Sequence, residues 1–147
     1  MINHARTLFI TATGTIGGLI ASFLGGWDND IITLVIFMVI DYIMGVIIAA
    51  FLGKSEKSDN GALSSKAGWI GLCRKCVTLL FVIIAHRLDI LIGTEYIRNA
   101  VVIGFCVSEL VSITENAGIM GLPLPSAVTR AIDILKNKGE DKFEQNK

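Results

Sequence analysis

Charged residues are scarce in this chain, and their signs cancel. Asp, Glu, Lys and Arg make up 18% of the 147 residues, with 13 basic residues against 13 acidic ones. Soluble domains carry about 25% charged residues, whereas 52% of the residues here are hydrophobic. The composition indicates an integral membrane protein in the lipid bilayer. Without a basic excess it gives no reason to expect a nucleic-acid partner.

Cysteine and histidine are too few to build the usual metal or catalytic sites. Cys73, Cys76 and Cys106 lie in apolar surroundings and do not suggest a disulfide framework. The first two have the C-x2-C spacing of a zinc site, but no second pair or nearby histidine completes one. His4 and His86 are far apart in the chain, and no glycine-rich phosphate loop follows a strand. We therefore expect no enzyme activity, no metal and no cofactor.

Long apolar runs are what the chain has instead. About 20 apolar residues cross a ~30 Å hydrocarbon core as a helix, and residues 7–26 and 31–53 meet this length. Two further spans are predicted at about 75–93 and 97–116, the former interrupted by His86, Arg87 and Asp89. We predict an all-α integral membrane protein with about four transmembrane helices in residues 1–122.

The two ends of the chain need separate interpretations. The first run is too long for a signal peptide and precedes an equally apolar run, so we expect it to remain as a span. Pro123 and Pro125 end the helical domain, and residues 123–147 are predicted to form an amphipathic helix from Ser126 and a charged cytoplasmic tail.

The basic residues predict the orientation. They concentrate in the segment 54–75 and in the C-terminal tail, whereas the loop at 27–30 has none. The positive-inside rule therefore places both termini and the middle loop in the cytoplasm. A three-span alternative, with the third run on the membrane surface, would put the lysines of the tail on the wrong side.

Asp41 is the only charge in the second run. A carboxylate at such depth costs roughly 2.5–3.5 kcal/mol on insertion scales and usually marks a functional or packing site. Small residues share its helix face at a spacing of four, and the first run has a similar stripe, with Thr7, Thr11 and Thr15 nearby. The expected helix-packing positions are Gly14, Gly18, Ser22, Gly26, Gly45, Ala49 and Gly53. Such stripes let helices approach closely, within one bundle or between subunits.

A second carboxylate, Glu109, lies in the fourth run at a depth comparable to that of Asp41, counting 1.5 Å of rise per residue. No basic residue is expected at this depth, so the two carboxylates could be neutral hydrogen-bonded acids or could line water. A structural ion pair or hydrogen bond within one protomer is the alternative. The predicted intramembrane polar and assembly residues are Asp41, Glu109, Ser112, Glu115 and Asn116.

Several clusters in order along residues 36–136 resemble the holin family of phage lysis and clostridial-type toxin secretion. They comprise Asp41 with Gly45; Ser64, Ser65, Gly68, Gly71 and Lys75 in the expected cytoplasmic loop; Asp89; Glu109, Ser112, Glu115 and Asn116; and Gly121, Pro123 and Pro125 ahead of a basic helix.

The resemblance implies a protein of the bacterial cytoplasmic membrane that forms homo-oligomers and opens a pore or lesion. A cell-wall hydrolase (endolysin) or a large protein toxin would pass through it without necessarily binding. One alternative is a small ion channel or carrier subunit using Asp41 and Glu109, although no internal repeat is visible. Another is an antiholin-type regulator.

Overall fold

The computed structural model describes residues 2–52 and 65–144, and the regular structure in these ranges is helical. The elements are α1 (Ile2–Leu24), α2 (Asn29–Ile47), the short π-helical segment η1 (Ile48–Leu52), α3 (Ser65–Ile92), α4 (Ile97–Ile119) and α5 (Ser126–Glu144). The predicted all-α class is confirmed, and the amphipathic C-terminal helix begins at Ser126 as expected.

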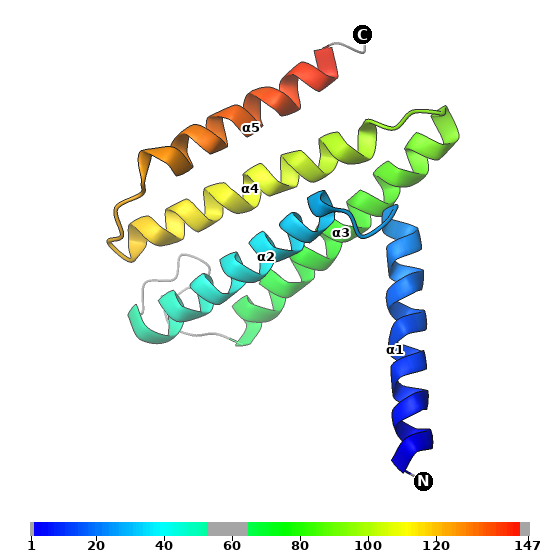
Figure 1. The fold of residues 1–147 in the computed structure, drawn as a ribbon. Helices are drawn as coiled ribbons and strands as arrows, with labels where there is room; N and C mark the ends of the chain where they lie inside the picture. Colours follow the sequence, from blue (N-terminus) through cyan, green and yellow to red (C-terminus); the bar gives the residue numbers. More distant parts are fainter. Residues whose placement is uncertain (1, 53–64, 145–147) are drawn as a thin grey trace.

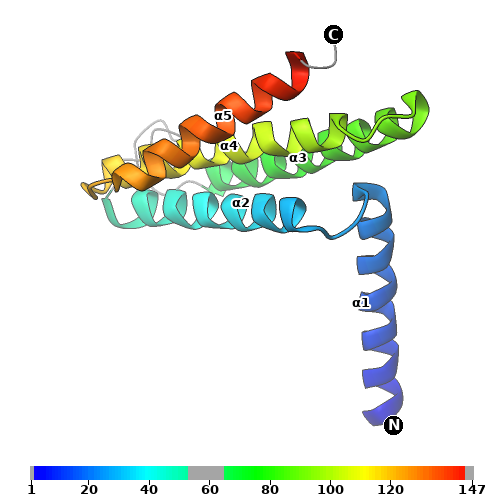
Figure 2. The same cartoon turned by 45° about the horizontal axis from the view of Figure 1, so that its top comes forward.

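Three helices form the body of the molecule, and one projects from it. α2, α3 and α4 lie side by side, and α5 runs back along α4 (Figure 1). α1 points away from this bundle and meets it near the C-terminal end of the helix (Figure 2). Its main partner in the bundle is α3. The outer length of α1 therefore has no neighbour among the described helices.

Among the helices of residues 2–52 and 65–144, three are long and apolar enough to cross a membrane: Asn3–Leu24, Asn29–Leu52 and Ile97–Ile119. They correspond to the predicted first, second and fourth spans. α3, which contains the predicted third span, is a continuous helix of 28 residues. Its charged residues make it less apolar than the other three, so a fourth crossing stays a prediction.

The residues predicted for the cytoplasmic loop are helical where the structure describes them, and this prediction is wrong. Ser65, Gly68, Gly71 and Lys75 all lie in α3. Tyr42 of α2 lies against this part of α3: a Cβ added at Gly68 would be 3.5 Å from the Tyr42 hydroxyl, and one at Gly71 3.8 Å from its ring, both ordinary contact distances. Gly53 and Ser64 lie outside the described residues.

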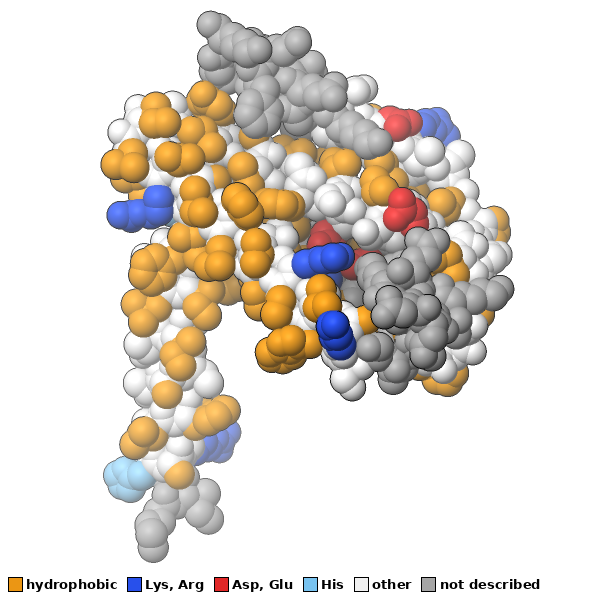
Figure 3. All heavy atoms as spheres, turned by 180° about the vertical axis from the view of Figure 1, so that it is seen from behind, with side chains coloured by type: hydrophobic (Ala, Val, Ile, Leu, Met, Phe, Trp, Pro, Cys, Tyr) orange, Lys and Arg blue, Asp and Glu red, His pale blue; other side chains and the backbone are white. Residues whose placement is uncertain are grey.

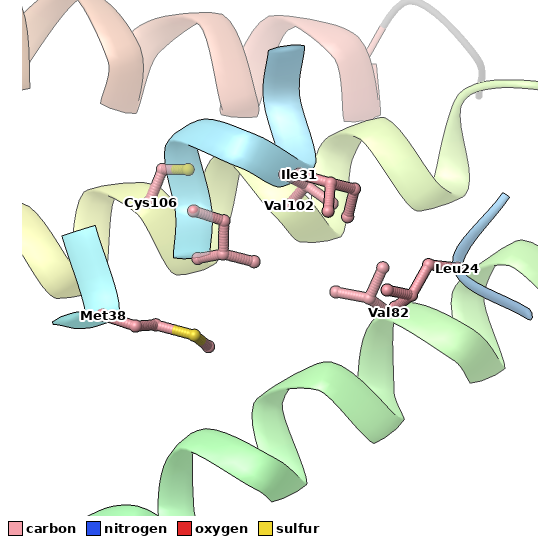
Figure 4. Packing of buried hydrophobic residues seen from close by; sticks show 7 residues of the cluster. Leu24, Ile31, Met38, Val82, Val102 and Cys106 are labelled. Carbon is pink, nitrogen blue, oxygen red and sulfur yellow. The ribbon is translucent and has the colours of Figure 1, made fainter. Parts of the chain in front are cut away.

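The buried core is small for a chain of this hydropathy. Its cluster comprises Leu24, Ile31, Leu34, Met38, Val82, Val102 and Cys106. Figure 4 shows these side chains between α2, α3 and α4, with Leu24 entering from the end of α1. Large hydrophobic side chains elsewhere are exposed, and Figure 3 shows many of them along α1 and the neighbouring end of the bundle. This distribution suits a protein whose outer surface faces lipid.

The connection from α1 to α2 is a tight elbow at Gly25. This residue has φ 82°, a left-handed conformation that side chains disfavour. An added Cβ would lie 2.7 Å from Nδ1 of His86 and 2.9 Å from Nε of Arg98. Asp28 then begins α2, its carboxylate accepting a hydrogen bond of 3.0 Å from the Ile31 N–H. The backbone conformation and the close neighbours therefore require glycine at position 25, and the Asp28 carboxylate caps the start of α2.

Candidate functional site: a buried lysine between two carboxylates

The ammonium of Lys75 lies between the carboxylates of Asp41 and Glu109. Its Nζ is 2.9 Å from Oδ2 of Asp41 and 2.5 Å from Oε2 of Glu109. The three side chains come from α3, α2 and α4, and only 15%, 5% and 13% of their surfaces are exposed. One cation thus connects all three helices of the bundle.

Asn116 completes this group from the same helix as Glu109. Its side-chain amide donates a hydrogen bond of 3.0 Å to Oδ1 of Asp41, so both oxygens of that carboxylate are bound. We call Asp41, Lys75, Glu109 and Asn116 the lysine–carboxylate cluster. Among the described residues, no buried side-chain nitrogen or oxygen lacks a hydrogen-bond partner. Because these buried groups are hydrogen-bonded, the polar side chains are stable in apolar surroundings.

The expectation that no basic residue shares the depth of Asp41 and Glu109 is wrong. It placed Lys75 at the cytoplasmic end of a span, but α3 begins at Ser65 and carries Lys75 well inside a helix. There the ammonium meets both carboxylates, as the hydrogen bonds show. The structure contains ion pairs within one protomer, the arrangement that the sequence left open as an alternative.

The remaining predicted polar residues of α4 do not join the cluster. Glu115 is exposed and Ser112 is half-buried, and no contact described for either reaches Asp41 or Lys75. Gly121, with φ 74°, ends the turn after α4. The two prolines, Pro123 and Pro125, are exposed in the connection to α5. Assembly roles for these residues stay predictions.

The small residues predicted for helix packing fall into two groups. A Cβ added at Gly14, Gly18 or Gly45 would meet no atom of another described residue within 4 Å, so no close helix contact is seen at these positions in the described part of the chain. Ser22 is likewise exposed, whereas Gly26 is half-buried in the elbow and Ala49 is half-buried in η1.

A second buried polar group, which the sequence analysis missed, fixes the elbow. Arg98 of α4 is only 6% exposed. Its Nε donates to the Leu24 carbonyl at 2.5 Å, one Nη donates to Oδ2 of Asp28 at 2.7 Å, and the other Nη donates to the Gly26 carbonyl at 3.5 Å. We call Arg98 with these acceptors the Arg98 clamp. Its hydrogen bonds join the end of α1 and the start of α2 to α4.

Asp89 of α3 holds the start of α4 in the position that the clamp needs. Its carboxylate accepts hydrogen bonds from the N–H groups of Ile97 and Arg98, at 3.0 and 2.8 Å, and from the Thr94 hydroxyl at 2.6 Å. Orphan N–H groups at a helix start are commonly satisfied in this way. The available sequence signal was Asp89 near the end of the predicted third span, followed by Arg98 near the start of the fourth.

Asp28 predicts a pH dependence for the clamp. Burial raises the pKa of Asp28, but the hydrogen bond and charge of Arg98 and the Ile31 N–H together hold the pKa below its ordinary value. A depressed pKa in the folded protein stabilises the fold above the unfolded value of about 3.9 and loses that contribution as pH falls through the folded value. We expect the difference in Tm between wild type and Asp28→Asn to be constant from pH 7 to 5 and to shrink below about pH 4. A difference unchanged down to pH 3 would contradict this assignment.

Metal ligands do not gather in the described parts of the chain. Within residues 2–52 and 65–144, no group of three or more His, Cys, Asp or Glu side chains could hold an ion. Cys73 and Cys76 are exposed on α3, and Cys106 is buried in the core.

Comparisons with known proteins cover nearly the whole chain. Residues 18–137 match the model of the bacteriophage holin family. An uncharacterized protein of Listeria monocytogenes is 35% identical over 133 residues, which are 89% of each chain. An uncharacterized 14.9 kDa protein of Clostridium perfringens is 33% identical over 84% of this chain and 89% of its own. A Bacillus phage phi105 protein, named a probable holin, is 28% identical over 85% of this chain and 87% of its own. No solved structure matches the chain.

Proposed function

The chain belongs to the bacteriophage holin family, and we propose that it assembles in the bacterial cytoplasmic membrane into a pore or lesion that releases an endolysin or a protein toxin. Family membership makes it a non-enzymatic, multi-pass membrane protein, as the sequence indicated. The proposed orientation keeps both termini and the segment before α3 in the cytoplasm. Lys75 no longer counts toward that charge bias because its half-buried ammonium pairs with Asp41 and Glu109.

The observation that carries the assembly step is the uncovered face of α1. This helix is almost entirely exposed along its length and buries mainly Leu24 at its end. Gly14 and Gly18 lie on it without any neighbour within 4 Å of an added Cβ. Small residues at this spacing let membrane helices approach closely. Since no described residue packs on Gly14 or Gly18, we assign this part of the stripe to contact with a second copy of the chain.

The threonines near this stripe can face lipid without a partner. The Thr7 hydroxyl donates to the Asn3 carbonyl and the Thr15 hydroxyl to the Thr11 carbonyl, each at 2.8 Å. Their hydrogens are therefore satisfied within α1. A helix of this kind can be stable alone in lipid and still present a weakly polar wall in an assembled lesion.

The lysine–carboxylate cluster has a different place in the proposal. Asp41 is 4% exposed in the protomer, and its carboxylate is bound by groups from α3 and α4. We assign the cluster to holding α2, α3 and α4 as one unit, which leaves α1 for contacts between protomers. This assignment replaces the idea of Asp41 and Glu109 lining a lumen.

Induced expression with two simultaneous readouts tests the function. We expect loss of membrane potential together with release of a folded cytoplasmic protein. Ion flux without protein release would favour the channel or carrier alternative. Expression without toxicity, combined with delay of lysis by an active holin, would favour an antiholin-type regulator.

A substitution in the α1 stripe tests the assembly step. We expect Gly18→Leu to leave the protomer fold unchanged, because open space surrounds the position, and to weaken association by roughly 1–2 kcal/mol, or about 5–30-fold. Chemical crosslinking in membranes and the time of protein release after induction measure the effect. Ala12→Leu, at an exposed position of α1 away from the stripe, is the matched control. Equal crosslinking in the two variants would contradict a role for the stripe.

A further inference from the structure

An apolar groove lies on the outer side of α3, away from the lysine–carboxylate cluster. It has a volume of about 440 Å³, within the range of small-molecule sites. Ile70, Val77 and Phe81 of α3 and Phe105 of α4 form its apolar wall. The rings of Phe81 and Phe105 lie with their centroids 6.3 Å apart. The groove is open, and its surface is almost entirely apolar.

Arg74 supplies the positive charge of this groove. It lines the groove and its side chain is exposed. None of the ion pairs among the described residues involves Arg74, whereas its neighbour Lys75 points into the bundle and pairs with two carboxylates. Lys66, two turns earlier on the same side of α3, is a second exposed cation. Arg74 is therefore exposed on the outside of α3, whereas the adjacent Lys75 faces the inside of the bundle.

A guanidinium beside an apolar groove matches an anionic phospholipid. Arginine binds phosphate oxygens in a bidentate geometry, and basic pockets between membrane helices bind anionic head groups. Val77 and Phe81 follow Arg74 by one and two turns, so a chain descending from a phosphate at Arg74 would lie over them and Phe105. A helix from a second copy would have to bring its own acidic group to Arg74.

We propose that this groove binds one acyl chain of an anionic phospholipid whose phosphate rests on Arg74. The site rests on the proposed crossing of the membrane by α3, in which the segment from Arg74 to Ile92, about 27 Å of helix, places Arg74 near the head groups. It does not depend on pore formation. It can therefore be tested separately from the proposed function.

Quenching of a single tryptophan by brominated lipids tests the site. In the full-length chain with Trp27→Phe and Trp69→Phe, Phe81→Trp places the reporter on the groove wall. Leu80→Trp, at a similarly exposed neighbour outside the groove, is the control. Each is reconstituted in phosphatidylcholine vesicles containing phosphatidylglycerol, with bromine on one lipid or the other.

We expect the Phe81→Trp reporter to prefer phosphatidylglycerol over phosphatidylcholine by about fivefold in relative association, the effect of one basic side chain at an anionic membrane. The Leu80→Trp reporter should show no such preference. Arg74→Gln should abolish the preference at the groove, and Arg74→Lys should retain part of it. Equal quenching by both lipids, or a preference that survives Arg74→Gln, would overturn the proposal. Shielding of the groove reporter from both lipids would also overturn it, because a protein segment would then be the occupant.

Discussion

Lys75→Met is expected to lower the free energy of unfolding by about 3–5 kcal/mol, the largest effect of any single substitution outside the hydrophobic core. The variant removes the Lys75 ammonium from a site where Asp41 and Glu109 are only 5% and 13% exposed. Two carboxylates are then left in apolar surroundings, and either ionisation or protonation costs free energy. Unfolding in mixed detergent micelles, followed by far-UV circular dichroism, measures the change.

Two controls separate the cluster from the general loss of a lysine. Lys66→Met removes an exposed lysine from the first turn of the same helix and should change stability by no more than about 0.5 kcal/mol. The triple variant Asp41→Asn, Lys75→Met and Glu109→Gln removes every charge together and should recover most of the loss, because no buried ion is left unpaired. If Lys75→Met behaves like Lys66→Met, the cluster does not hold the bundle together.

The same variants distinguish a structural role from a role in the lesion. Lys75→Met should accumulate poorly in the membrane and delay protein release. If the triple variant restores both accumulation and release timing, the charges act by holding α2, α3 and α4. A triple variant that folds and accumulates but releases no protein would instead assign the charges to the assembled lesion.

Hydropathy was sufficient to predict the helices whose apolar residues are continuous. The runs around Asp41 and Glu109 predicted α2 with η1 and α4 to within a few residues, since a span of this length depends on bilayer thickness alone. α3 was harder, because its charged residues resemble a loop when their partners are unknown. Those partners lie 34 residues away on either side of Lys75, beyond the reach of local patterns.

The sequence identified the carboxylates of the candidate site, Asp41 and Glu109, but not the part played by the basic residues. An isolated carboxylate in an apolar run is conspicuous because its cost in lipid is high, so Asp41 and Glu109 could be selected from sequence. Lysine and arginine are expected near membrane surfaces by the positive-inside rule, and this expectation misplaced Lys75 and left Arg98 without a role. Which basic residue faces inward depends on helix rotation, which only the packing of α3 and α4 determines.

Arg98→Met is expected to release α1 from the bundle and to cost about 2–3 kcal/mol, the contribution of a hydrogen bond made by a charged group. The variant removes the donor to the Leu24 carbonyl and to Oδ2 of Asp28. Leu24 is the only residue of α1 in the core cluster, so apolar packing alone gives little resistance to movement of the helix. Spin labels on α1 and α3, in a chain with Cys73→Ser and Cys76→Ser, report the effect as a distance distribution.

The wild type should give a narrow distribution and Arg98→Met a broad one. Arg87→Met, at an exposed arginine of α3, should leave the distribution narrow, which separates the clamp from a general loss of positive charge. A narrow distribution in Arg98→Met would show that the elbow is held by its backbone alone. If the distribution broadens while α2, α3 and α4 keep their stability, the direction of α1 depends on the Arg98 clamp. The face of α1 proposed for assembly would then be oriented by one buried arginine and not by the apolar core.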